Sequence, residues 1–408
     1  MQAEILSIGT ELTTGQNLDT NSQWLSRRLA EIGISVGWHT TVADDFAANV
    51  EAFAIAARRA RLVIATGGLG PTQDDLTREV LAQVAGVELV FHEPSLAHIQ
   101  HLFQSRGRTM PERNRTQAMF PAGSDVVFNA KGTAPGIWMT IGDAVVVALP
   151  GVPAEMFAMY ATEVQPRLMT LGLGGGVQIE RKINSFGGGE SHVEEKLVDV
   201  TRRGQVPEVG ITASDAVISL RIVARAATHA EAQAQIEPVE KTIRERLGDW
   251  VYGVGDETLQ DVVIRLLSER NLTLATAESI TAGLVANRLA QVPGASAWFR
   301  GGVVSYTDAV KTKLLGVPEE MIREHSAVSA PVAEAMAVGV RRSLGTDLAV
   351  STTGYAGPTG EPVGLVFVGL AWAGGVSSTS FHWFGSRTEI QSRAAKMALN
   401  IVRLHLGR

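Results

Sequence analysis

The chain contains no cysteine, and this absence removes several classes of function. Without thiols it forms no disulfide, no thiolate zinc site and no cysteine nucleophile, so covalent catalysis would need Ser, Thr, Lys or a carboxylate. It also lacks an apolar run of membrane-spanning length. The first residues, "MQAEILSIGTEL", lack the basic, apolar and small-residue regions of a signal peptide. We therefore expect a cytoplasmic protein without membrane contact.

Basic clusters are missing as well, and the net charge is −6. This balance argues against a dedicated nucleic-acid binder, because such proteins carry a basic patch. What is present is an ordinary globular composition, 45% hydrophobic and 19% charged, over 408 residues. One hydrophobic core rarely serves a chain of this length, so we expect two or three domains.

Apolar strands and amphipathic helices alternate over the first 170 residues. The stretches "AEILSI", "ISVGWHTTV" and "RLVIAT" are typical of strands, and "NSQWLSRRLAEIG" and "DDFAANVEAFAIAARRA" have the apolar spacing of helices. Strands that alternate with helices in this way predict an α/β fold, a three-layer αβα domain around a mostly parallel sheet.

The glycine-rich stretch "LGLGGG", residues 171–176, predicts a linker. After it, "RKINSFGGGESHVEEKLVDV" indicates a strand, a glycine turn and a helix, and "DAVISLRIVARA" alternates like another strand. This pattern predicts a small α+β domain. Further strands and helices follow "DWVYGVGDE", so we expect an α/β domain at the end of the chain. The predicted domains are residues 1–170, 171–253 and 254–408.

A glycine-rich turn follows the strand "RLVIAT" in "TGGLGPTQDDLTRE". Its glycines allow positive φ and a close backbone approach, and the following helix N-terminus favours an anion. Two adjacent aspartates would repel a phosphate unless a divalent cation lay between them. The loop therefore predicts a site for a phosphate with its metal. The alternative is an ordinary turn whose aspartates cap the helix.

Two further turns favour the ligand site. "GTEL" with "LDTN" follows the first strand, and "KGTAPG" precedes the last strand of the domain. In an open α/β sheet such turns gather at the carboxyl edge, where ligands bind.

The motifs of this domain resemble those of a known family. "GTELTTGQNLDTN", "GGLGPTQDDLTRE", "NRTQAMFPAGS", "KGTAPG" and "LPGVPAEM" are similar to the N-terminal domain of the CinA (competence/damage-inducible protein A) family, which is related to the molybdopterin-binding MogA/MoaB fold. The resemblance covers the whole chain in order. It implies a metal-dependent ADP-ribose pyrophosphatase that releases AMP and ribose 5-phosphate with Mg, Mn or Co. The sequence leaves open whether a monovalent cation is also needed.

The same resemblance assigns the residues of this site. It places Asp75 as a catalytic residue, and it gives Asp44, Asp74 and Asp75 as metal ligands. A metal held by these carboxylates would neutralise the diphosphate and lower the pKa of an attacking water. Glu11 would orient that water, although a structural role for Glu11 is equally open. The expected substrate contacts are Gly9, Thr10, Glu11, Gly67, Gly68, Gly70, Thr72, Lys131, Gly132 and Thr133.

The middle domain contains "GGGESHVEEK", which resembles the KH-like insert of CinA proteins. A KH domain that binds nucleic acid clamps phosphates with its glycine loop, and it needs positive charge around that loop. Residues 171–250 contain ten Lys and Arg against twelve Asp and Glu. A spacer or a dimer contact is therefore the favoured role. The resemblance implies a homodimer.

The third domain carries a serine at the end of the strand "LTLAT", in "AESITAGL". Tyr306 ends another predicted strand, and Lys311 follows in the first turn of the next helix. Ser279 becomes a nucleophile only when a base removes its proton. Lysine is that base only if its surroundings lower its pKa. The spacing alone equally fits a serine that caps a helix.

Here too the motifs resemble a family. "AES", "VPGASAWFRGGVVSYTDAVKTKLLGV", "HSAVSAPVAEAMAVGVR" and "TGYAGP" look like the PncC-type C-terminal domain of CinA proteins, a nicotinamide mononucleotide (NMN) deamidase. The resemblance implies hydrolysis of the NMN carboxamide to nicotinate mononucleotide and ammonia without a cofactor. Ser279 would be the nucleophile, and Tyr306 and Lys311 would activate it. The expected substrate contacts are Thr281, Gly283, Gly354, Gly357 and Arg387.

Two departures from the family pattern concern this second site. The family usually has AESCTGG, whereas Ile280 and Ala282 replace the Cys and the first Gly here. Alanine is unfavourable at this position if the backbone needs positive φ. The loop "TGYAGPTGEPVG" is short and carries Glu361 where the family has Lys, and an acid weakens phosphate binding by repulsion.

Three classes of function stay open at this point. The first is a bifunctional pyridine-nucleotide hydrolase of NAD recycling, acting on ADP-ribose and NMN. The second is a molybdopterin- or nucleotide-binding enzyme that transfers an adenylyl group. The third is a competence or DNA-damage accessory protein with a degenerate deamidase site, which acts through a partner such as a recombination protein.

Overall fold

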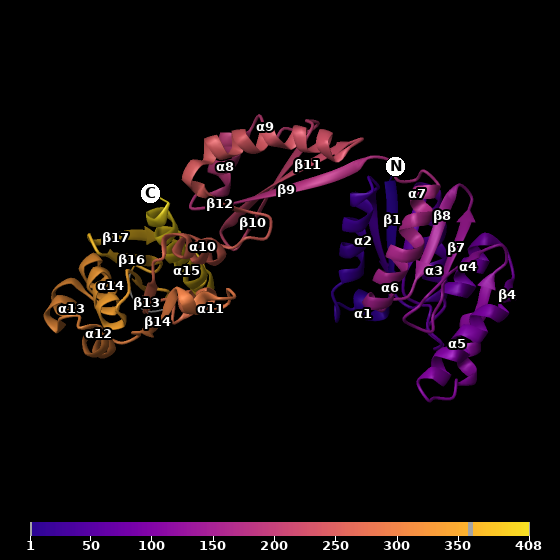
Figure 1. Cartoon of the computed structure of the whole chain (residues 1–408), viewed down its shortest axis with the longest axis horizontal. Helices are drawn as coiled ribbons and strands as arrows, with labels where there is room; N and C mark the ends of the chain where they lie inside the picture. Colours follow the sequence, from indigo (N-terminus) through magenta and orange to yellow (C-terminus); the bar gives the residue numbers. More distant parts are fainter. Residues whose placement is uncertain (1, 358–361, 408) are drawn as a thin grey trace. The chain divides into compact units, whose positions relative to one another are not determined.

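The computed structural model describes residues 2–357 and 362–407. The chain divides into two compact units, Met1–Ile179 with Arg225–Gln233 and Glu180–Ala224 with Ala234–Arg408. Figure 1 shows the elements along the chain. No helix in the described ranges has the length and apolar character needed to cross a membrane.

The first unit is built on a six-stranded sheet with the order β2-β1-β3-β8-β7-β6. Four strands are parallel, as the sequence predicts: β1 (Gln2–Ile8), β2 (Ser35–Val42), β3 (Leu62–Thr66) and β8 (Ala144–Leu149). The other two, β7 (Gly136–Ile141) and β6 (Asp125–Val127), continue the sheet in antiparallel pairing. Because β3 is buried along its whole length, its sequence is an uninterrupted apolar run that ends in threonine.

Helices cover both faces of this sheet (Figure 1). Leu25 and Leu29 of α2 (Thr20–Glu31) join Met156 of α6 (Pro153–Met159) in one core cluster. Phe53 of α3 (Phe46–Arg59) and Leu81 of α4 (Thr77–Ala85) belong to the cluster on the opposite face. The predicted three-layer αβα domain is therefore confirmed. The remaining helices and strands are α1 (Thr10–Thr13), β4 (Leu89–Phe91), α5 (Glu93–Ser105), β5 (Met119–Pro121) and α7 (Gln165–Thr170).

The middle domain is a four-stranded sheet with the order β10-β11-β9-β12 and two helices. The predicted strands and helices are present as β9 (Val177–Phe186), α8 (Glu190–Leu197), β11 (Val217–Ala226) and α9 (His229–Leu247). β12 (Val251–Val254) pairs with β9. Sequence reasoning missed β10 (Glu208–Ser214), because this edge strand contains a glycine and few apolar residues.

The turn between β10 and β11 is fastened to the last helix, α15 (Arg387–Leu406). Asp215 and Ala216 turn the chain with φ values of 48° and 60°. Lys396 of α15, which is 6% exposed, donates to the Asp215 carbonyl and forms an ion pair with its carboxylate. The Ser392 hydroxyl donates to the same carboxylate over 2.9 Å. The hairpin turn therefore docks on α15 through polar contacts.

The last domain has a five-stranded sheet with the order β14-β13-β15-β16-β17. The strands β13 (Leu274–Glu278), β14 (Phe299–Val304) and β15 (Leu348–Gly354) are parallel, whereas β16 (Leu365–Trp372) and β17 (Gly375–His382) form an antiparallel hairpin. One core cluster includes residues of α10 (Leu259–Arg270), α11 (Leu284–Ala290) and α15. The other includes residues of α12 (Asp308–Leu315) and α14 (Ala330–Leu344), and α13 (Glu319–His325) lies between these helices in the chain.

In both sheets the parallel part reverses its winding at one strand. The chain places β2 on one side of β1 and β3 on the other, and it places β14 and β15 on the two sides of β13. Such a reversal leaves a crevice beyond the carboxyl end of the central strand, where ligands of α/β sheets bind. Gly9 follows β1 and Ser279 follows β13, so each predicted site begins at such a point.

We expect the exchange Asp215→Asn to destabilise the second compact unit by about 0.5–1 kcal/mol at neutral pH, because Lys396 loses its ion pair and water screens the half-exposed Asp215 carboxylate. Burial by itself raises the pKa of Asp215, but hydrogen bonds from Lys396 and Ser392 outweigh it and leave this pKa below its ordinary value. The stabilisation is therefore present above the unfolded pKa of about 3.9 and is lost as the pH falls through the folded value. Urea unfolding at several pH values measures it, and an equal deficit at pH 3 and pH 7 would contradict this account.

Candidate functional site

A pocket of about 460 Å³ lies where β1, β3 and β8 end. Its wall carries the carboxylates of Glu11, Asp44, Asp74, Asp75 and Glu155, and no Lys or Arg is among the described residues that line it. The structure thus brings together most of the residues predicted for this site. Those in its wall are Gly9, Glu11, Asp44, Gly67, Gly68, Gly70, Thr72, Asp74, Asp75 and Thr133.

The glycine turn after β3 needs its first two glycines. Gly67 and Gly68 have φ values of 109° and 65°. A Cβ atom on Gly67 would lie 2.3 Å from the Ile8 carbonyl oxygen, and one on Gly68 would lie 2.3 Å from the Thr77 hydroxyl oxygen. Side chains are excluded at both positions, so the turn packs directly against the end of β1 and the start of α4.

Asp75 folds back into this turn. Its carboxylate accepts hydrogen bonds from the Gly70 N–H over 2.7 Å, from the Thr72 N–H over 2.8 Å and from the Thr72 hydroxyl over 2.5 Å. The helix α4 begins after Leu76 without a side-chain cap. The aspartates therefore do not cap the helix, so the alternative interpretation, an ordinary turn with capping aspartates, does not describe this loop. Two amides expected to bind a phosphate already bind Asp75.

A buried arginine supports the turn from below, and sequence reasoning missed it. Arg78 is 2% exposed and donates to the Leu69 carbonyl over 2.9 Å. Burial lowers the pKa of Arg78 to about 10, and Glu79 and Asp75 oppose this change, so the guanidinium is charged at neutral pH. Gln117 donates to the same carbonyl over 3.3 Å. The turn is thus held at its middle by a buried cation.

The turn after β1 is tied to the end of β2 through Asp44. The Asp44 carboxylate accepts hydrogen bonds from the N–H and the hydroxyl of Thr10, both over 2.8 Å. The Thr10 side chain is thus used within the protein, and Asp44 is fixed in the pocket wall.

Glu155 and Asn129 are the second feature that sequence reasoning missed. Asn129 is 1% exposed and donates to the Glu155 carboxylate over 2.7 Å. Its side-chain oxygen accepts from the N–H groups of Lys131 and Gly132, over 3.0 and 2.9 Å. A Cβ on Gly132 would lie 2.0 Å from a Glu155 oxygen. Gly132 therefore packs directly against the Glu155 carboxylate. Lys131 is exposed and is not among the described residues of the pocket wall.

The carboxylates of this pocket fit a cation whose ligand atoms come partly from the protein and partly from a bound molecule. Within residues 2–357 and 362–407 no three His, Asp or Glu side chains cluster tightly enough to hold a metal ion alone. Magnesium is commonly bound by one or two carboxylates together with substrate phosphates and water. Asp44, Asp74 and Asp75 line one pocket and meet that lower requirement.

A second hollow, of about 450 Å³, adjoins the first. Ile8, Glu11 and Gly151 belong to the walls of both. Asn21 donates to the Gly151 carbonyl over 2.8 Å and fixes part of this shared wall. The two hollows are therefore neighbours that share the Glu11 side of their walls.

The second candidate site lies at the carboxyl edge of the last sheet. Glu278 pairs in register with Val304 of β14 and Thr352 of β15. The next residue, Ser279, is 9% exposed. The parallel register therefore brings Ser279 to the same edge as Tyr306, which follows β14, and Gly354, which ends β15.

Glu278 organises the turn after this serine. It is 1% exposed and accepts four hydrogen bonds, from the Thr281 hydroxyl over 2.7 Å and from the N–H groups of Gly283, Val285 and Ala286 over 2.9, 3.0 and 2.8 Å. The amides at the start of α11 are thus used by the protein's own anion. Thr281 and Gly283, predicted as ligand contacts, direct these donors to Glu278.

The predicted activating residues share the edge but have other partners. Lys311 is 2% exposed and donates to the Asp308 carboxylate over 3.2 Å. Arg387 donates to the Tyr306 hydroxyl and, over 2.6 Å, to the Gly357 carbonyl. Within the described residues no hydrogen bond joins the Ser279 hydroxyl to Tyr306 or Lys311. Catalytic hydrogen bonds often tighten only when the substrate is bound.

The departures from the family pattern have structural consequences. Ile280 is 4% exposed and joins the core, and its Cδ1 atom would lie 2.8 Å from a Cβ on Gly354. Ala282 has a φ of 50°, in the left-handed region that glycine adopts without cost. Glu361 lies outside the described residues.

Comparisons with known proteins agree with this architecture. Residues 4–170 match the family described as "Probable molybdopterin binding domain", residues 180–253 the "Damage-inducible protein CinA KH domain" and residues 256–406 the "CinA C-terminal domain". The chain is therefore an α/β protein with a MogA/MoaB-like domain, a KH-like domain and a C-terminal α/β domain.

Similar proteins cover its whole length. A CinA-like protein of Dictyoglomus thermophilum is 45% identical over 99% of this chain and 98% of its own. A CinA-like protein of Frankia casuarinae is 44% identical over 100% of this chain and 96% of its own. The solved structure of the protein CinA from Thermoplasma acidophilum is 31% identical over 41% of this chain and 98% of its own, with a TM-score of 0.38. The chain belongs to the CinA family.

We expect the exchange Ala282→Gly to stabilise the second compact unit by about 0.5–1 kcal/mol, because the left-handed backbone strains alanine and not glycine. Urea unfolding measures the change. The control Ala234→Gly lies on the exposed side of α9, and it should lose about 1 kcal/mol. A loss of stability at both positions would show that Ala282 carries no strain.

Proposed function

We propose that the first unit hydrolyses ADP-ribose to AMP and ribose 5-phosphate with the help of a divalent cation. The observation that supports this proposal most strongly is the pocket wall, with five carboxylates and no Lys or Arg among its described residues. Such a wall repels a diphosphate unless a cation lies between them. The two adjoining hollows suit a ligand with two halves, such as the adenosine and the ribose phosphate of ADP-ribose.

The cation would neutralise the diphosphate and supply an activated water. Asp44, Asp74 and Asp75 are the residues that would hold it. Asp75 is preorganised for this purpose, because three donors of the glycine turn fix its carboxylate before a ligand arrives. Glu11, which lines both hollows, would orient the water.

The exchange Asp75→Asn should reduce kcat/KM for ADP-ribose by at least about 100-fold, because the amide replaces a charged ligand and donates where the turn also donates. Release of AMP from ADP-ribose with Mg, Mn or Co is the measurement. The same exchange at Asp143, an exposed residue of the turn between β7 and β8, is the matched control and should leave the rate unchanged. Retained activity in the Asp75 variant would mean that the site has been misplaced.

We propose that the last domain hydrolyses the carboxamide of NMN. Support comes from the position of Ser279 at the winding reversal of the sheet, at the same sheet edge as Tyr306, whose hydroxyl accepts a hydrogen bond from Arg387. The Ser279 oxygen would attack the carboxamide carbon, and its proton would pass through Tyr306 and Lys311 to the leaving ammonia. Water would then cleave the ester and restore the serine. Glu278 positions the serine by fixing the turn that follows it.

The exchange Ser279→Ala should lower ammonia release from NMN by at least about 1,000-fold, because no other nucleophile replaces the serine. Ser268→Ala, on the exposed face of α10, is the control and should keep the wild-type rate. An unchanged rate in the Ser279 variant would exclude the serine mechanism.

The two rival functions give different results in the same assays. An adenylyl-transfer enzyme would attach AMP to an acceptor and would not release it from ADP-ribose alone. Absence of both hydrolytic activities, together with binding to a recombination protein, would favour the accessory role.

A further inference from the structure

A hollow of about 480 Å³ lies in the second compact unit, and Ser279, Tyr306 and Lys311 are not among the described residues that line it. The glycine turn 187–189 and Trp250 of the middle domain form one side of it. Arg393 and Met397 of α15, with Trp383 after β17, form the other. Its volume falls within the range of about 300–1,000 Å³ that small-molecule sites occupy.

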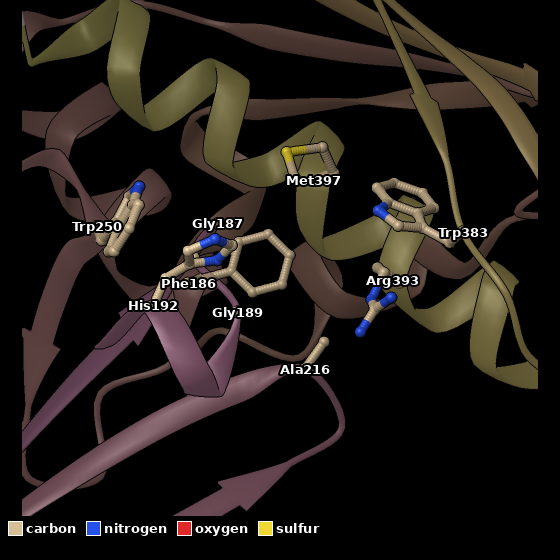
Figure 2. Close-up of a pocket in the computed structure, with 10 residues that line it drawn as sticks. Phe186, Gly187, Gly189, His192, Ala216, Trp250, Trp383, Arg393 and Met397 are labelled. Carbon is tan, nitrogen blue, oxygen red and sulfur yellow. The ribbon is translucent and has the colours of Figure 1, made fainter. Parts of the chain in front are cut away.

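Aromatic rings dominate the wall. Figure 2 shows Trp250 and Trp383 at opposite ends of the hollow, with Phe186 between them. Phe381 stacks on Trp383 with ring centroids 5.1 Å apart, which holds this indole in place. Gly188 lies flat against Trp250, because a Cβ there would approach the ring within 2.6 Å. The wall thus offers fixed aromatic surfaces to a planar ring.

One cation in this wall, Arg393, forms no ion pair within 4 Å in the part of the chain that the structure describes. Its guanidinium lies over Trp383, 5.8 Å from the ring centroid. Glu389, one turn earlier on α15, interacts with Arg393 only at a distance, because its carboxylate accepts from the N–H and the hydroxyl of Ser386 over 2.7 Å. The described lining residues include no Asp or Glu, and His192 also faces the hollow.

The charge of this wall is opposite to that of the pocket in the first unit. That pocket has five carboxylates and no Lys or Arg among its described lining residues, so an anion enters it only with a cation. The hollow beside α15 has a guanidinium and no carboxylate among those residues, so it accepts an anion directly.

We propose that this hollow is a further binding site, for a planar aromatic ring that carries a negative group, of the nucleoside monophosphate class. The base lies among Phe186, Trp250 and Trp383, and the phosphate pairs with Arg393. Stacking on aromatic side chains and a charged hydrogen bond to arginine are the interactions that such ligands use.

A single nucleotide fits these features better than a strand of nucleic acid. The volume suits one small ligand, and a strand would need a groove with many cations. The domain around the glycine turn has ten Lys and Arg against twelve Asp and Glu over residues 171–250. This charge balance does not attract a phosphate backbone.

The test uses the full chain labelled with 5-fluorotryptophan, with a chelator present so that the carboxylate pocket has no cation. The ¹⁹F signals of Trp250 and Trp383 are assigned with Trp→Phe variants. AMP should shift both signals saturably. Adenosine and ribose 5-phosphate, which each lack one half of the ligand, should bind at least tenfold more weakly.

Arg393→Gln should weaken AMP binding at these two signals at least tenfold. Arg323→Gln, at a residue with a 77% exposed side chain on α13, is the matched control and should leave AMP binding unchanged. The proposal is overturned if millimolar AMP moves neither signal, if Arg393→Gln has no effect, or if a single-stranded oligonucleotide binds more tightly than AMP. Because this readout needs no turnover, it is independent of both proposed activities.

Discussion

The structure depends on carboxylates that accept hydrogen bonds from the chain's own turns. Asp75 takes the amides of Gly70 and Thr72 in the first unit, and Glu278 takes those of Gly283, Val285 and Ala286 in the second. Both turns have the form that binds ligand anions in other α/β proteins. Here an internal anion satisfies the free N–H groups and defines the shape of the turn without a ligand.

These two carboxylates have different surroundings. Glu278 is buried, and its four donors compensate its charge within the protein. Asp75 shares a pocket wall with four other carboxylates, and the buried Arg78 interacts with its charge. The first pocket therefore gathers five carboxylates and no Lys or Arg among its described wall residues, whereas Glu278 is paired with donors of its own turn.

The sequence predicted the architecture because strand and helix periodicities are local properties, and it predicted both sheet edges because turn motifs follow the strands. It could not predict which atoms meet within the turns. Asn129 and Glu155 lie 26 positions apart, and only the fold brings them together. Arg78 follows two acids and a threonine in a pattern typical of an exposed helix start, yet it is 2% exposed. The sequence predicted strain at Ala282 only if the backbone there has a positive φ, and its φ is 50°.

The helix α15 belongs to two domains at once. Gln391 donates to the Ile280 carbonyl beside Ser279, Lys396 holds the hairpin turn at Asp215, and Arg403 donates to the Val251 carbonyl over 3.1 Å. Phe186 and Tyr252 of the middle domain also pack into the core cluster that contains α15. A fragment that starts at residue 254 would expose this apolar side and leave Lys396 unpaired. In this chain the middle domain therefore covers one side of α15. To be soluble, the isolated last domain would need new polar residues on that side.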